Sequence, residues 1–464
     1  MSLNTSIESS NLISSKKLFT YKEQEHISDS DRELFQKLDL KFEPTPYEGI
    51  PKYLGISNEW TSYYIGASWL TKDRAIVVTP KSIKNNEDLE TDFIEIYIQA
   101  LKFLPSAEYF SKFYGIDFEQ PQIETNSLSE QLTPLLIIHY ISCLQKITEH
   151  GLKKGYVIRE ENLHSKVKGR IIIHKNLQKN IFTQRHDRVF CRFQEYTVDI
   201  PENRLLKKAL EFSSSCFDKL ISLNYHAELG QIKQEINSIR TAFTQVSENI
   251  EVYEIKNFRK NKLFKEYSEA IKVAKMILRF FDYSISKTSV TPTSVPPFWI
   301  DMSRLFEVYV YSKLHEAYGN VIKFQVPGHL GSVADFIKTD EKLIIDAKYK
   351  TKYQKNNSAI LSDMRELSGY SRDNRILRAI GVKKASLQEN EPVIPCIIIY
   401  PEYQELEIDK LMDEEEKKEI EEYNKSDSLK STVFDKPMLQ LVEGHDIPGF
   451  RKFYKLFVEL PVKK

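Results

Sequence analysis

The chain has 464 residues, enough for two or three domains. Hydrophobic residues make up 41% of it and aromatic residues 12%, which excludes a disordered chain. Its 66 basic residues are balanced by 66 acidic ones, so bulk charge gives no basis for nucleic-acid binding and any DNA contact must come from a local patch.

Cysteines and hydrophobic segments narrow the class of protein further. The four cysteines are scattered without a Cys-x-x-Cys pair, which argues against a zinc ribbon and a disulfide framework. The first residues lack a basic segment followed by an apolar one, and no apolar run approaches the length of a membrane span. We therefore expect a cytoplasmic protein without a membrane contact.

The N-terminal part predicts a mixed α+β domain. A serine-rich tail at residues 1–17 is expected to be mobile, and the domain is expected to follow at 18–130. Within it, residues 63–66 and 75–80 favour strands, while 93–104 favour a helix. This domain is a candidate region for contact with a partner.

The middle part, residues 131–286, predicts a largely helical domain with a basic hairpin. Helices are expected at 135–147, 203–223 and 261–283, and strands at 157–173 and 188–193. The hairpin is interpreted either as a contact for phosphate or an acidic partner, or as a solvated edge whose charges discourage aggregation. Its candidate contact residues are Lys166, Lys168, Arg170, Lys175, Arg185 and Arg188.

Residues 287–297 contain serine, threonine and three prolines, and are expected to form a linker into a last domain at 298–464. In that domain, residues 333–338 and 343–348 are rich in β-formers and are separated by four polar residues, which predicts an antiparallel hairpin. If the middle two of these form a two-residue turn, Asp335 faces Asp346 with their Cβ atoms about 5 Å apart. A longer turn would shift this register.

Two like charges so placed destabilise a sheet unless a cation neutralises them. Lys348 lies two residues beyond Asp346 and therefore on the same face of the strand. Carboxylates hold Mg²⁺, which stabilises charge on a phosphoryl oxygen and activates water, and Lys348 would orient that water or offset the developing charge. The pattern indicates a metal-dependent nuclease site; the alternative is a surface hairpin with ordinary charges.

Further elements are predicted on either side of the hairpin. A helix with Glu307 at the margin of its apolar face and a first strand precede it. A helix in which Glu366 and Tyr370 lie one turn apart, and then a buried strand, follow it. The expected ranges are 300–318, 321–326, 362–380 and 393–400.

This order of helix, three strands, helix and strand resembles the core of the PD-(D/E)XK nucleases, a mixed sheet flanked by helices. The resemblance implies that Asp335, Asp346, Glu307 and the backbone carbonyl of Ala347 are metal ligands. It implies that Lys348 is the catalytic lysine, and that Mg²⁺ is the cofactor with Mn²⁺ as an alternative. The expected fold class is thus α/β within an α+β multidomain chain.

Two positions depart from that pattern. Ala334 stands where the family name has proline, a residue that does no chemistry. Glu366 stands one turn before Tyr370, where related nucleases often carry glutamine. The roles of Glu366 and Tyr370 as accessory residues are therefore left open.

A narrower resemblance covers more of the chain. Five segments, in order, resemble landmarks of the McrC family, and they are residues 168–170, 190–193, 199–207, 301–307 and 346–350. McrC proteins are nuclease subunits of two-component, modification-dependent restriction systems that act against phage DNA. The resemblance implies DNA as the substrate. It also implies a hexameric AAA+ GTPase ring of the McrB type as the partner, which the nuclease subunit engages and stimulates.

The sequence contains no Gly-x-x-x-x-Gly-Lys-Ser/Thr phosphate loop, so a translocating nuclease would need its motor from another chain. Two alternatives are kept. One is a non-catalytic activator of the GTPase, and the other is a nuclease of the same superfamily that works in repair without a motor. The intact Asp335, Asp346 and Lys348 favour an enzyme, and the ordered landmarks favour the restriction subunit.

Overall fold

The computed structural model describes the chain in segments: residues 17–40, 51–57, 59–80, 93–102, 113–117, 119–125, 129–223, 227–250, 265–285, 294–349, 357–382, 393–402, 432–443, 447 and 451–461. Apart from Lys17, the expected N-terminal tail lies outside these segments. So does the expected linker at 287–297, apart from its last four residues. Within these segments, no helix is both long and apolar enough to cross a membrane.

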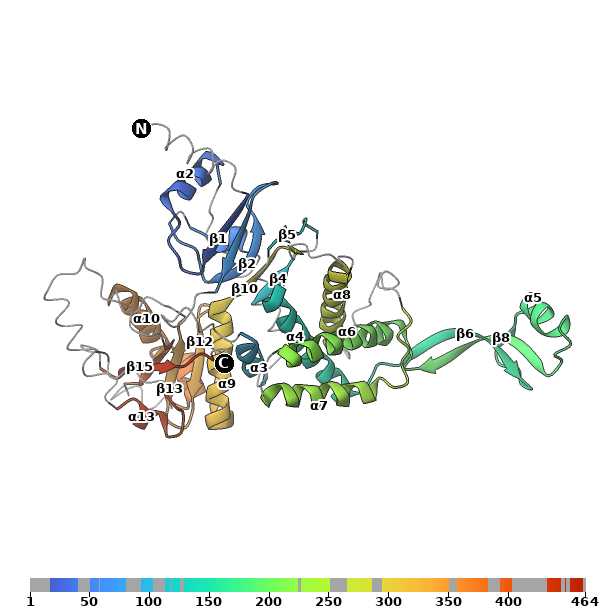
Figure 1. Ribbon diagram of the computed structural model, residues 1–464. Coiled ribbons are helices and arrows are strands. Elements are labelled where there is room, and N and C mark those ends of the chain that lie inside the picture. Colours follow the sequence, from blue (N-terminus) through green and yellow to red (C-terminus); the bar gives the residue numbers. More distant parts are fainter. Residues whose placement is uncertain are drawn as a thin grey trace, which may run out of the picture. The chain divides into compact units, whose positions relative to one another are not determined.

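The chain forms two compact units (Figure 1). The first combines residues 1–132 with 292–464, and the second consists of residues 133–291. This differs from the expected series of consecutive domains, because the strands at 294–295 and 298–301 pair with strands of the N-terminal part. The second unit is thus inserted into the sequence of the first.

The first sheet of unit 1 is mixed. Strand β1 is parallel to β3, and all other neighbours are antiparallel. Gly66 in β2 is required there, since a Cβ atom would lie 2.1 Å from the carbonyl oxygen of Phe298 in β10. In sheet order, the strands are β1 (Leu18–Lys22), β3 (Ala75–Thr79), β2 (Tyr64–Trp69), β10 (Phe298–Asp301) and β4 (Tyr114–Ile116).

Short elements accompany this first sheet. Strands β5 and β9 form a separate antiparallel pair. The apolar residues of α2 join those of β1, β2 and β3 in one core, in which the Phe19 ring packs edge-on against Phe35. These elements are α2 (Asp29–Lys37), η1 (Lys52–Gly55), α3 (Phe93–Lys102), β5 (Ile123–Glu124) and β9 (Ser294–Val295).

The second sheet of unit 1 has five strands in sequence order. The first two pairs, β11 with β12 and β12 with β13, are antiparallel; β13, β14 and β15 run parallel. Strands β13 and β14 are buried throughout, as central strands are when both faces of a sheet are covered. The strands are β11 (Ile322–Pro327), β12 (Val333–Lys338), β13 (Leu343–Ala347), β14 (Cys396–Pro401) and β15 (Phe453–Val458).

Helices cover both faces of this second sheet (Figure 1). Ile344 packs with the apolar residues of α10 (Asn357–Tyr370) and α11 (Asn374–Ile380). On the other face, Tyr311 of α9 (Met302–Tyr318) stacks on Phe324 and Phe336. The single helix expected at 362–380 is wrong, because Asp373 accepts hydrogen bonds from the backbone N–H groups of residues 375 and 376 and caps a new helix. The short helices are η6 (Gly319–Val321) and α13 (Met438–Leu441).

Unit 2 consists of helices and a long arm (Figure 1). The helices are α4 (Ser129–His150), α6 (Pro201–Leu223), α7 (Ala227–Ala242) and α8 (Lys265–Ile285). The arm is built on β6 (Gly155–His164) and β8 (Arg188–Thr197), with β7 (Arg170–Ile171), α5 (Ile173–Asn176) and a π-helical turn η3 (Leu177–Ile181) toward its tip. The strand expected to reach Ile173 is wrong, because Ser165 takes a positive φ of 50° just after β6 ends.

Candidate active site

The hairpin register expected from the sequence is confirmed. Phe336 pairs with Ile345, and the two preceding pairs follow the same register. The ladder ends there, one residue short of the two aspartates. Asp335 instead accepts a hydrogen bond through Oδ2 from the backbone N–H of Ala347 at 3.0 Å. The side chain of Asp335 is therefore held against the end of the strand that carries Asp346.

The turn between these strands differs from the two-residue turn expected. It has four residues, Thr339 to Lys342, yet it keeps the same register. Lys338 is buried, and its ammonium lies 2.7 Å from Asp340 and 2.5 Å from Glu341, so the charges of the turn are neutralised locally. Lys342 takes a positive φ of 56° that closes the turn.

Lys348 links the hairpin to helix α10. Its Nζ lies 2.9 Å from Oδ2 of Asp346 and 3.0 Å from Oε2 of Glu366. The hydroxyl of Tyr370 donates to Oε1 of Glu366 at 2.8 Å. The structure therefore brings Glu366 and Tyr370 together with Asp346 and Lys348, whereas their spacing had indicated only that Glu366 and Tyr370 are neighbours on one helix face.

Glu307 of α9 belongs to the same group of acidic residues. Its Oε1 accepts a hydrogen bond from Nε2 of Gln325 at 3.1 Å. Burial raises the pKa of Glu307 to about 7; the Gln325 hydrogen bond opposes this rise and repulsion from Asp346 adds to it. Glu307 and Asp346 thus interact electrostatically, although they come from separate elements.

The two aspartates also resist ionisation. Burial, followed by repulsion from Glu307, raises the pKa of Asp335 to about 7. Asp346 is only 1% exposed, and burial together with repulsion from Asp335 raises its pKa well above the ordinary value. For Lys348, burial favours the neutral amine, but the carboxylates of Asp346, Asp335 and Glu366 outweigh it and raise the pKa. The lysine is the cation that this arrangement retains.

The donor set suits a hard divalent cation in its chemistry. Carboxylate oxygens are the ligands that Mg²⁺ prefers, and a cation would offset the repulsion that raises these pKa values. Within the described segments, no three histidine, cysteine or acidic side chains are close enough together to hold a metal ion as they stand.

The six basic candidate residues of the predicted hairpin lie on the arm. Three of them contact an acidic or aromatic side chain of the arm itself. Lys175 and Arg192 both bind Glu160, Lys168 lies over the Phe193 ring, and Arg188 lies 3.8 Å from Asp187. The remaining three candidates, Lys166, Arg170 and Arg185, are exposed. Local pairing thus accounts for about half of the basic cluster.

The family model for "McrBC 5-methylcytosine restriction system component" matches residues 61–375, more than half of the chain. The chain belongs to this McrBC family. The resemblance to McrC drawn from the sequence landmarks is therefore confirmed at family level.

Solved structures give a weaker likeness. One is a half-complex from a tetradecameric assembly of Thermococcus gammatolerans McrB AAA+ hexamers with bound McrC. It has 14% identity and a TM-score of 0.37, and covers 96% of this chain and 94% of that one. A second, the T. gammatolerans McrBC complex, has 13% identity and a TM-score of 0.29 over 65% of this chain and 88% of that one. A comparison with curated proteins finds no match.

The arm of this McrBC-family chain carries apolar residues that the motif search missed. Phe182 is 75% exposed and Ile173 is 71% exposed, and further exposed residues near them are Val167, Ile171, Leu177 and Ile181. A signal was present, since Ile173, Leu177 and Ile181 recur at intervals of four, which is a helical face. Contiguous exposed apolar patches commonly mark sites of interaction with other proteins or with membranes.

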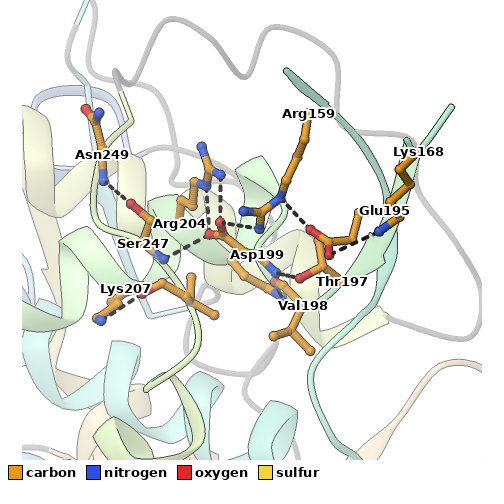
Figure 2. Close-up of polar contacts among 12 residues, drawn as sticks. Arg159, Lys168, Glu195, Thr197, Val198, Asp199, Arg204, Lys207, Ser247 and Asn249 are labelled. Carbon is orange, nitrogen blue, oxygen red and sulfur yellow. Dashed lines mark hydrogen bonds and ion pairs between the residues drawn. The ribbon is translucent and has the colours of Figure 1, made fainter. Parts of the chain in front are cut away.

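A charged network lies where the arm meets the helices (Figure 2). Asp199, just after β8, accepts two hydrogen bonds from the Arg204 guanidinium, at 2.8 and 2.7 Å, and one from the backbone N–H of Ser247 at 2.9 Å. Arg159 of β6 lies 3.5 Å from Asp199 and also pairs with Glu195 of β8. The network ties both strands of the arm to the start of α6.

Proposed function

We propose that this chain is the nuclease subunit of a two-component, modification-dependent restriction system. It would cut phosphodiester bonds of DNA with Mg²⁺ while engaged by a ring-forming AAA+ GTPase of the McrB type. Membership of the McrBC family supports the restriction role. The observation that carries the nuclease role is Lys348, placed between Asp346 and Glu366 beside the half-buried carboxyl groups of Asp335 and Glu307.

In this proposal the domain of the second sheet is a PD-(D/E)XK nuclease domain. Asp335, Asp346, Glu307 and the backbone carbonyl of Ala347 would hold Mg²⁺, with Mn²⁺ as an alternative. When bound, the ion would stabilise charge on a phosphoryl oxygen and lower the pKa of water. Lys348 keeps its charge among three carboxylates, so it would offset negative charge developing on the phosphate or orient the attacking water.

Glu366 and Tyr370 receive accessory roles in this proposal. Glu366 shares the Lys348 ammonium with Asp346, and Tyr370 fixes Glu366 through its hydroxyl. When Asp346 turns toward a metal, Glu366 remains to hold the lysine. A glutamate at this position therefore orients a cation, which a neutral glutamine would do more weakly.

The arm is proposed as a contact with the GTPase rather than with DNA. Its exposed apolar residues suit a protein surface, and several of its basic residues are neutralised by neighbours on the arm. The absence of a phosphate loop from the sequence supports a motor supplied by another chain. A system of this kind works on DNA in the cytoplasm.

The test compares wild type and Asp346→Ala for cleavage of modified DNA with Mg²⁺, with and without a McrB-type GTPase from the same genome. Wild type should cut when the GTPase is present, and the variant should lose at least about 100-fold in rate, because an essential metal ligand is gone. The matched control is Asp340→Asn, an aspartate on the turn of the same hairpin, which should cut normally. Equal cleavage by wild type and Asp346→Ala would reject the site.

Two other outcomes distinguish the alternatives. If no protein cuts but GTP hydrolysis by the partner rises when this chain is added, the chain is an activator without catalysis. If wild type cuts equally well without the GTPase, it is a nuclease that needs no motor. Lys348→Ala should retain Mg²⁺ affinity while losing most turnover, which separates the lysine from the metal ligands.

A further inference from the structure

The residue after the proposed catalytic lysine is tied to the first sheet. Tyr349 is buried, and its hydroxyl donates a hydrogen bond of 2.8 Å to Oε1 of Glu23, which directly follows β1. Nε2 of Gln24 donates to the carbonyl oxygen of Tyr349 at 3.4 Å. Both the side chain and the backbone of Tyr349 thus contact residues far away in sequence.

The Glu23 end of this contact is held firmly. Glu23 is 0% exposed, and its backbone N–H donates to the carbonyl oxygen of Thr79 at 2.9 Å, continuing the pairing of β1 with β3. The backbone N–H of the next residue donates to Ser62 at 3.1 Å. A buried carboxylate is costly unless it is hydrogen-bonded, so the phenol of Tyr349 is a partner that this position needs.

The Tyr349 end touches both sides of the proposed site. The backbone N–H of Lys348 donates to the carbonyl oxygen of Ile399 at 3.0 Å, and this is the last hydrogen bond between the two neighbouring strands. Tyr349 is the next residue, so its contacts fix the chain just beyond the end of the strand. The Tyr349 ring lies 5.7 Å, between centroids, from the ring of Phe306, the residue before Glu307. The segment that carries the lysine therefore contacts, through the Tyr349 ring, the helix that carries the glutamate.

The first sheet also holds helix α9 directly. Strand β10 pairs with β2 and β4 and runs straight into α9, and the backbone N–H of Met302 donates to the carbonyl oxygen of Tyr63 at 3.2 Å. Asp301, the last residue of β10, caps the helix by accepting from the backbone N–H of Arg304 at 3.1 Å. The same sheet is thus linked to Glu307 through β10 and to Lys348 through Tyr349.

We propose that Glu23 and Tyr349 are positioning residues for the proposed nuclease reaction, on which this inference rests. Their hydrogen bond fixes the end of β13 and so sets the place of the Lys348 ammonium between Asp346 and Glu366. The first sheet is then a part of the active-site framework and not only a separate binding module. Neither residue touches the reacting atoms.

The first variant is Tyr349→Phe, which removes one oxygen and keeps the ring on Phe306. With the full chain, Mg²⁺ and the GTPase, kcat for DNA cleavage should fall about 10- to 100-fold, the effect of losing a hydrogen bond to a charged group. KM for DNA and the Mg²⁺ affinity should stay within about twofold, because neither DNA contacts nor metal ligands change. A merely structural role would not separate kcat from KM in this way.

The matched control is Tyr21→Phe. Tyr21 is a buried phenol of the same sheet, and its hydroxyl donates to the carboxylate of Asp31, away from the proposed site. It should lower Tm about as much as Tyr349→Phe and leave kcat unchanged. Glu23→Gln keeps an acceptor oxygen and should cut nearly as wild type, while Glu23→Ala should match Tyr349→Phe. The double variant Tyr349→Phe with Glu23→Ala should have a kcat no lower than either single variant, since both substitutions remove the same hydrogen bond.

A second measurement does not depend on nuclease activity. Amide hydrogen exchange of metal-free protein, followed on peptides covering 343–349, should accelerate in Tyr349→Phe and Glu23→Ala but not in Tyr21→Phe. If wild type fails to cut while exchange responds as expected, the proposed function fails and the positioning contact stands. The inference would be overturned if Tyr349→Phe showed the same kcat and the same exchange as wild type. If Tyr349→Phe does not fold, Glu23→Ala takes its place in this comparison.

Discussion

At the scale of single residues, Asp346 faces opposing demands. Its carboxylate is buried and close to Asp335, which raises its pKa, while the Lys348 ammonium at 2.9 Å favours the charged form. Lys348 in turn is shared with Glu366. In the proposed reaction, Lys348 would therefore remain anchored by Glu366 when Asp346 binds an ion.

This sharing predicts a graded response at Glu366. Glu366→Ala removes one of the two close ion pairs of Lys348, so cleavage should fall about 10- to 100-fold, the usual effect of losing a charged hydrogen bond. Glu366→Gln keeps an acceptor and should lose less. Steady-state cleavage rates at saturating Mg²⁺ measure this. Wild-type rates in Glu366→Ala would exclude a role in holding the lysine.

The pKa of Glu307 predicts how stability depends on pH. Burial raises this pKa to about 7, against about 4.3 in the unfolded chain, so between these values the folded protein binds more protons. The contribution of Glu307 to metal-free stability is therefore fully present below about pH 4 and is lost as pH rises through 7. Asp335 acts in the same direction.

Urea unfolding of metal-free protein at pH 5 and pH 8 tests this. The loss of stability between the two pH values should be smaller in Glu307→Gln than in wild type. Adding Mg²⁺ at pH 8 should stabilise wild type more than the variant, because an ion that binds only the folded state shifts the equilibrium toward it. Identical pH slopes in the two proteins would contradict the assignment.

At the scale of elements, the arm joins the helices through the Asp199 network (Figure 2). Hydrogen bonds from Arg204 lower the pKa of Asp199; burial opposes this, and the N–H of Ser247 adds to the lowering. Because Arg159 and Glu195 sit on the two strands of the arm, a single carboxylate connects both strands to α6.

Asp199→Asn should destabilise unit 2 by about 2 kcal/mol at pH 7, since charged hydrogen bonds become neutral ones. The pKa of Asp199 is lower in the folded protein than in the unfolded chain. Its contribution to the free energy of unfolding is therefore complete above about pH 4 and is lost as pH falls through the folded pKa. The difference from wild type should therefore shrink in acid. The control Asp218→Asn breaks the exposed pair with Lys233 and should change stability by less than about 1 kcal/mol.

Elements with a strong local pattern could be predicted from the sequence. The helix expected at 203–223 is α6, at 201–223, and the hairpin has the register expected from a turn centred on residues 340 and 341. The contact of Glu366 with Lys348 was not predicted, because it depends on where α10 packs against the sheet. The helical tip of the arm was not predicted, because only three apolar residues, Ile173, Leu177 and Ile181, mark its helical face among many charged ones.

At the scale of the whole molecule, pairing between distant segments decides the organisation. Strand β10 joins the first sheet although the residues of unit 2 separate it in sequence from β2 and β4. Nothing in the local sequence of residues 298–301 indicates its partners, so a consecutive series of domains was the simpler expectation. For the same reason, the contact of Glu23 with Tyr349 could not be anticipated.

The apolar surface of the arm predicts a loss of partner binding without a loss of folding. Phe182→Ser combined with Ile173→Ser should weaken binding to the proposed GTPase at least about 10-fold, as expected for central apolar contacts. Since both side chains are exposed, Tm should change by less than about 2 °C. Titration calorimetry and thermal unfolding measure the two effects. The exposed basic control, Lys166→Ala, should bind nearly normally.

The insertion of unit 2 into unit 1 has a consequence for biosynthesis. A growing chain releases β1, β2 and β3 first, but their sheet lacks β10 until residues 298–301 have left the ribosome. Unit 2 is complete by then, so it can fold while the first sheet still lacks that strand. The carboxylates of the hairpin and the lysine emerge later still. A chain interrupted during translation would thus present a complete arm but an incomplete candidate active site.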